Sequence, residues 1–117
     1  MKISMIKELL DAEVLCCEEH LGRHVYSACG CDLMSDVLAF VKDQAVLLTG
    51  LVNPQVIRTA EMMDMVCVVF VRSKAPTEEI LELARECGIV VLMSNKRLYD
   101  ACGILYTNGL VGNRVKT

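Results

Sequence analysis

Three short runs of apolar residues constrain the fold of this chain more than any other feature of the sequence. They cover residues 45–49, 66–71 and 89–93, and each leads into a segment with a helix-start signal. Strands that are covered by helices on both faces read as continuous Val, Ile and Leu runs, because neither side meets water. The pattern therefore predicts an α/β fold with a small, mostly parallel sheet of four to five strands, flanked by helices on both faces.

The length and charge of the chain narrow its class. Its 117 residues suit one domain, which we place at residues 1–110, followed by a loosely ordered tail over 111–117. No apolar run approaches the length of a membrane span, and Lys2, Lys7 and Glu8 interrupt the stretch where a signal peptide needs an apolar core. The net charge of −3 provides no field for a polyanion. We expect a cytoplasmic protein that binds neither nucleic acid nor membrane.

Helices and strands alternate along the sequence. Apolar periodicity predicts strands at 13–17 and 24–29 in addition to the three runs, and an opening helix at 3–10. Asp32 suits the N-cap of the second helix, the two prolines suit the starts of the third and fourth, and Gly88 suits the end of the fourth. Ser94 or Asn95 is expected to cap the last helix, which Gly109 ends.

This topology predicts where a ligand would bind. In parallel sheets, ligands lie outside the carboxyl ends of the strands, beside loops that lead into helix N-termini. The loops at 29–32, 49–54, 72–76 and 94–97 would meet at that rim.

Two of these loops carry suitable side chains. Thr49, Gly50, Asn53 and Gln55 offer a hydroxyl, close backbone approach and two amides, which suit a phosphate, a carboxylate or a base edge. The alternative is an ordinary turn in which Asn53 caps the helix that begins at Pro54.

The loop at 72–74 is compact and basic. Arg72 and Ser73 could bind an anion there, and the alternative is a solvated charged turn. Arg58 and Arg97 are further cations near predicted helix starts, where they oppose the helix dipole, so stability does not require them.

The seven cysteines form neither a Cys-x-x-Cys pair nor an even set, so we interpret them mainly as small buried apolar residues. Cys29 and Cys31 remain weak candidates for a metal or redox site. The sequence has no phosphate-binding loop of the Gly-x-x-x-x-Gly-Lys-Ser/Thr type and no His-Glu-x-x-His motif. We therefore predict that the protein is not an enzyme and carries no cofactor.

The segment Asp32-Leu33-Met34-Ser35-Asp36-Val37-Leu38-Ala39, together with Arg23-x-Val25 and the late Ala101-Cys102-Gly103-Ile104-Leu105-Tyr106 segment, resembles the DRTGG domain family. The resemblance runs from the opening helix to about Leu110. It implies a small α/β domain similar to the N-terminal domain of HPr kinase/phosphorylase, usually dimeric and without catalytic activity. Where the family signature reads Asp-Arg-x-Val-Thr-Gly-Gly, this chain has Gly22-Arg23-His24-Val25-Tyr26-Ser27-Ala28.

These observations favour a stand-alone regulatory module, forming a homodimer, that senses a nucleotide or another anionic small molecule. One alternative is an interaction subunit that binds a partner enzyme or regulatory protein without a small ligand, and a weaker one is a thiol redox or metal sensor. The candidate ligand-binding residues are Arg23, Asp32, Ser35, Thr49, Gly50, Asn53, Gln55, Arg72 and Ser73.

Overall fold

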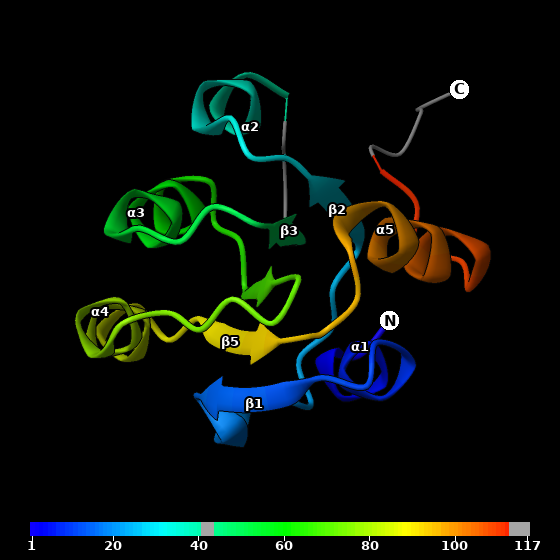
Figure 1. The fold of residues 1–117 in the computed structure, drawn as a ribbon, viewed down its shortest axis with the longest axis horizontal. Coiled ribbons are helices and arrows are strands. Elements are labelled where there is room, and N and C mark those ends of the chain that lie inside the picture. Colours follow the sequence, from blue (N-terminus) through cyan, green and yellow to red (C-terminus); the bar gives the residue numbers. More distant parts are fainter. Residues whose placement is uncertain (41–43, 113–117) are drawn as a thin grey trace.

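A five-stranded sheet forms the centre of the computed structural model, which describes residues 1–40 and 44–112 (Figure 1). Its strand order is β1-β5-β4-β3-β2. The strands are β1 (Glu13–Cys16), β2 (Ser27–Gly30), β3 (Ala45–Thr49), β4 (Cys67–Phe70) and β5 (Val90–Met93). β2 to β5 are parallel, and β1 pairs antiparallel with β5. The predicted α/β fold is confirmed. Most of the predicted tail, residues 113–117, lies outside the described residues.

Helices cover both faces of this sheet. α2 (Met34–Phe40), α3 (Pro54–Met62) and α4 (Glu78–Cys87) lie on one face, and α1 (Ile3–Leu9) and α5 (Leu98–Thr107) lie on the other (Figure 1). Side chains alternate along each strand, so in β3 Leu47 packs under α2–α4 while Leu48 packs under α1 and α5. Both core layers therefore draw on the same apolar runs. No helix in the described part of the chain is long and apolar enough to cross a membrane.

Several predicted helix signals act as expected. Pro54 occupies the first turn of α3, and Gly88 ends α4 in the left-handed region with φ 69°. Pro76, however, precedes α4, whose N-cap is Thr77; the Thr77 hydroxyl accepts a hydrogen bond from the Ile80 amide at 3.3 Å. Pro76 therefore predicted the region where α4 starts but not the first residue of the helix.

Two predicted boundaries were wrong for the same physical reason, a contact with the N-terminal segment. β2 begins at Ser27 and not at residue 24, because the Val25 amide donates to the Met1 carbonyl at 2.7 Å and His24 pairs with Lys2. α5 begins at Leu98, with Arg97 at its N-cap in place of Ser94 or Asn95. The buried Ser94 hydroxyl instead donates to the Leu10 carbonyl at 2.7 Å.

We expect Ser94→Ala to destabilise the protein by about 1–3 kcal/mol, because it leaves the buried Leu10 carbonyl without its donor and the Lys96 amide without the Ser94 oxygen that accepts from it. Urea unfolding followed by circular dichroism measures the change. Ser35→Ala, at an exposed position of α2, is the matched control and should alter stability by less than about 0.5 kcal/mol. Equal stability of the two variants would contradict this role of Ser94.

Candidate functional site

The loops that follow β2, β3, β4 and β5 lie at one rim of the sheet, toward the viewer in Figure 1, because these four strands are parallel. This arrangement was predicted from the alternation of strands and helices. It brings Asp32, Thr49, Gly50, Asn53, Arg72 and Ser73 to the same end of the molecule.

Asp32 joins the first two loops. Its Oδ1 accepts hydrogen bonds from the Thr49 hydroxyl at 2.9 Å and from the Gly50 amide at 2.8 Å. The fully buried Thr49 oxygen also accepts from the Leu51 amide at 3.1 Å. α2 begins at Met34, so the carboxylate that was predicted to cap this helix stabilises the neighbouring loop instead.

Arg72 occupies a constrained position after β4. Arg72 and Ser73 both have left-handed backbones, with φ 60° and 54°, which costs a non-glycine residue about 1 kcal/mol or more. Three hydrogen bonds stabilise this conformation, from the Arg72 amide to the Lys96 carbonyl at 2.8 Å, from the Ser73 amide to the Ser94 carbonyl at 2.9 Å, and from the Lys74 amide to the Val71 carbonyl at 3.3 Å. The Arg72 guanidinium lies against Gly50, where a Cβ atom would collide with it. The glycine therefore lets the guanidinium approach the backbone of this loop closely, and a side chain here would displace it.

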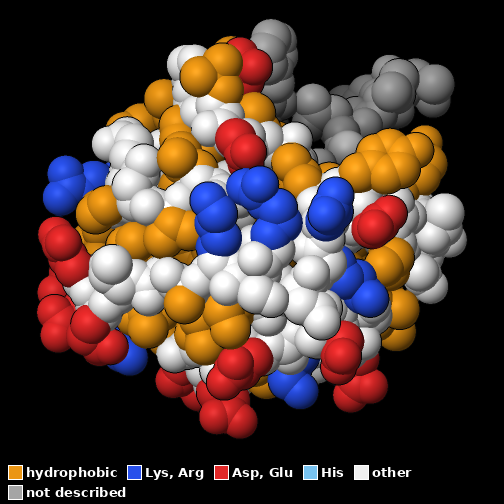
Figure 2. All heavy atoms as spheres, in the orientation of Figure 1, with side chains coloured by type: hydrophobic (Ala, Val, Ile, Leu, Met, Phe, Trp, Pro, Cys, Tyr) orange, Lys and Arg blue, Asp and Glu red, His pale blue; other side chains and the backbone are white. Residues whose placement is uncertain are grey.

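A hollow of about 560 Å³ opens beside this loop. Arg72, Ser73, Asn95 and Arg97 line it, so it presents two guanidinium groups, a hydroxyl and an amide. Lysine and arginine side chains gather near the middle of this face, close to β3, β4 and the start of α5 (Figure 2). Among the described residues the ion pair is that of Arg85 with Glu78, so neither arginine of the hollow has an acidic partner.

The alternative interpretation of the loop at 49–54, an ordinary turn in which the Asn53 side chain caps α3, is not what the structure shows. It occupies the N-cap position of α3, but its side chain makes no capping hydrogen bond. Its Oδ1 is buried and has no hydrogen-bond partner among the described residues. Gln55 bonds within α3, from its Nε2 to the Thr59 hydroxyl at 3.5 Å, and Ser35 is exposed on α2.

Arg23 is separated from the other candidate residues. It precedes β2, and its guanidinium donates to the carbonyl of Gly88 at 3.3 Å, just before the amino end of β5. It therefore lies at the opposite end of the sheet from Arg72.

Sequence reasoning missed the contribution of Asn95, which was considered only as a helix cap. Arg97 was noted as a cation near a helix start, but its place beside Arg72 was not predicted. The available signal was that the loop at 94–97 shares a rim with the basic loop at 72–74. Only the backbone bonds between the two loops show that they meet.

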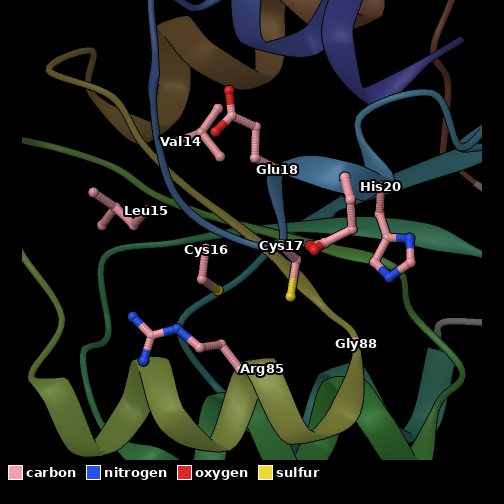
Figure 3. A pocket seen from close by; sticks show the side chains of 9 residues that line it. Val14, Leu15, Cys16, Cys17, Glu18, His20, Arg85 and Gly88 are labelled. Carbon is pink, nitrogen blue, oxygen red and sulfur yellow. The ribbon is translucent and has the colours of Figure 1, made fainter.

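A second hollow, of about 460 Å³, lies beside β1 (Figure 3). The sulfur atoms of Cys16 and Cys17 point toward α4, from which Arg85 extends toward Cys16. Burial raises the pKa of the Cys16 thiol to about 12 and also raises that of Cys17, so both thiols are protonated near neutral pH. This hollow is the less suitable of the two for an anion, because its arginine, Arg85, is already paired with Glu78 at 2.9 Å.

The metal alternative gains no support from geometry. Within residues 1–40 and 44–112, no group of three or more His, Cys, Asp or Glu side chains is placed to hold an ion. Cys31 is engaged with Leu33 in the turn before α2, where its sulfur accepts from the Leu33 amide at 3.3 Å. Burial raises the pKa of Cys29 to about 11, and the thiols of Cys31 and Cys102 add to the rise.

The fold and its rim define a small α/β domain with a cationic hollow at the carboxyl ends of its parallel strands. No family model matches the sequence, and no curated protein is similar to it. The structure is similar to the CBS and DRTGG domains of the regulatory region of Clostridium perfringens pyrophosphatase, solved with its activator, diadenosine tetraphosphate. The TM-score is 0.71 at 16% sequence identity, over 89% of this chain and 45% of that one.

This structural match confirms the predicted fold class and is consistent with a DRTGG domain. The chain spans a little under half the length of the chain that it matches.

We predict that alkylation of Cys16 and Cys29 by iodoacetamide is slow in the folded protein near pH 8. With a pKa of about 11, the Cys29 thiolate fraction is about a hundredfold lower than that of an ordinary thiol, because burial disfavours the charged form. The rate should rise about tenfold per pH unit toward pH 11. Peptide mass spectrometry measures each site, with the chain in urea as the control. Equal rates in folded and unfolded protein would contradict the prediction and revive the thiol-sensor alternative.

Proposed function

We propose that this chain is a non-catalytic regulatory module that binds an anionic small molecule, such as a nucleotide, at the carboxyl-end rim of its sheet. The observation that carries this proposal is the hollow in which Arg72 and Arg97 meet without an acidic partner among the described residues. Guanidinium groups bind phosphate and carboxylate through paired hydrogen bonds. Ser73 and Asn95 supply further donors at the same hollow.

Two features of the rim cost stability in the absence of a ligand, namely its concentrated positive charge and its left-handed backbone. Arg97 stands at the N-cap of α5, at the positive end of the helix dipole, and Arg72 adds a second positive charge beside it. The Arg72 backbone is also held in a left-handed conformation. These features oppose stability, and a bound anion would offset the charge repulsion. Strained residues of this kind gather at functional sites.

The structural match supports the regulatory part of the proposal. The similar region belongs to a regulatory segment of an enzyme, and that protein was solved with a polyphosphate activator. The shared fold suggests a related role here, with ligand binding that changes how a partner enzyme or regulatory protein is engaged. The absence of a Gly-x-x-x-x-Gly-Lys-Ser/Thr loop from the sequence agrees with a module that does not transfer phosphate.

We expect a nucleotide or phosphorylated metabolite to raise the melting temperature of the wild-type protein. At a concentration of 100 Kd, binding adds about 2.7 kcal/mol of stability, which corresponds to about ten degrees for a domain of this size. The double variant Arg72→Ala/Arg97→Ala should lose this shift, because both guanidinium groups of the hollow are removed. Differential scanning fluorimetry with ATP, AMP and pyrophosphate is the measurement.

Arg23→Ala is the matched control for this experiment. It also removes an exposed arginine, but at the opposite end of the sheet, so the ligand-induced shift should persist. A shift that survives in the double variant, or that disappears in Arg23→Ala, would place the ligand elsewhere. If no phosphate compound raises the melting temperature of the wild-type protein, the proposal is wrong.

One observation favours the interaction alternative, including the proposed homodimer. α5 is apolar around most of its circumference, which is typical of a covered helix. Tyr99 and Tyr106 are nevertheless 89% and 65% exposed, and their spacing of seven residues puts both on one side of the helix. We propose that this side of α5 lies at the interface between two copies of the chain.

We expect sedimentation equilibrium to show a dimer for the wild type and a monomer for Tyr99→Glu/Tyr106→Glu, since a buried unpaired carboxylate at the interface is costly. Both tyrosines are exposed in the single chain, so the double variant should keep its native circular dichroism spectrum. A wild-type monomer, or a variant that still dimerises, would rule out this face.

A further inference from the structure

Only one of the two carboxylate oxygens of Asp32 takes part in the contacts between the rim loops. Asp32 is exposed, and its Oδ1 takes the hydrogen bonds of Thr49 and Gly50. Its Oδ2 has no hydrogen-bond partner among the described residues. An ionised carboxylate can accept about four hydrogen bonds, so Asp32 keeps free acceptor capacity toward solvent.

This acceptor is fixed in place. Most exposed carboxylates move freely, but Asp32 is tied by one oxygen to a fully buried hydroxyl and to a backbone amide of the next loop. The Thr49 oxygen is itself held by the Leu51 amide. An acceptor that is oriented before a ligand arrives loses little conformational freedom on binding.

Asp32 lies next to the cationic part of the rim without being neutralised by it. The Gly50 amide donates to Asp32, and the same glycine lies against the guanidinium of Arg72. The two charged groups are thus separated by one glycine, yet they form no ion pair. A cation for phosphate and an acceptor for a donor group therefore stand side by side.

This arrangement discriminates between anions. A bare anion on Arg72 meets repulsion from Asp32, whereas an anion that carries a nearby hydroxyl gains a charge-assisted hydrogen bond from it. Sites built to accept from a substrate hydroxyl reject analogues that lack it, because the polar group of the site is then left unpaired.

We infer that the rim takes a hydroxyl-bearing phosphate ester, such as a nucleoside or sugar phosphate, and that Asp32 is the residue that selects it by accepting from a sugar hydroxyl beside the phosphate at Arg72 and Arg97. The inference rests on the proposed function, because it assigns the ligand class of the same hollow.

The test compares AMP with 2′,3′-dideoxy-AMP, which differ in the sugar hydroxyls and share charge and base. Isothermal titration calorimetry on the wild-type protein should give at least about tenfold tighter binding of AMP, the usual loss when a hydrogen bond to a charged group is removed. Asp32→Asn should reduce this preference to about twofold or less, because an amide donor replaces the free acceptor.

The asparagine variant is chosen so that folding is preserved. Its Oδ1 can still accept from Thr49 and Gly50, so its melting temperature should stay close to that of the wild type. Asp64→Asn is the matched control, since Asp64 is exposed in the segment before β4, at the opposite end of the sheet. It should keep the wild-type preference for AMP.

The possible failures are distinguishable. Equal binding of the two nucleotides to wild type, abolished by Arg72→Ala/Arg97→Ala, would overturn the role of Asp32 and leave the anion site standing. A preference that persists in Asp32→Asn would also overturn that role. No binding of either nucleotide or of pyrophosphate to the wild type would overturn the anion site and this inference together.

Discussion

The parallel pairing of β2, β3, β4 and β5 is the constraint on which the rest of the structure depends. A parallel pair needs a crossover between its strands, and each crossover here contains a helix that covers one side of the sheet. Strands covered in this way are mainly apolar, and the polar residues Ser27 and Thr49 stand at the first position of β2 and the last position of β3, so most of the polar and charged groups lie in the loops. The same pairing directs the loops after these strands to one rim.

At that rim, the loops stabilise one another more than the helices that follow them. Asp32 accepts its hydrogen bonds from Thr49 at the end of β3 and from Gly50 in the loop that follows, and not from α2. The loop after β4 is held in an unfavourable backbone conformation by carbonyls of the loop after β5. Polar groups that would ordinarily end or begin helices instead fix the relative positions of the charged side chains, which is what a binding site requires.

The predictable part of the structure follows from local pattern. Apolar runs located β3, β4 and β5 closely, Pro54 and Gly88 marked helix ends, and alternation placed the loops at one rim. The errors came from contacts between distant residues. The Ser94 hydroxyl bonds to Leu10, 84 residues away, and the start of β2 depends on Met1, so neither has a local signal. Likewise, Arg97 and Arg72 meet because two loops share backbone hydrogen bonds, which spacing cannot show.

Ser94 also connects the rim to the N-terminal part of the chain through two hydrogen bonds. Its carbonyl accepts from Ser73, beside the hollow, while its hydroxyl donates to Leu10 at the end of α1. One residue is thus shared by the cationic loop and by the segment that links α1 to β1. A displacement of the Ser73 backbone cannot occur without changing either its own hydrogen bond or that of Leu10. The cationic loop and the end of the first helix are therefore joined through one residue, although no side chain of α1 lines the hollow.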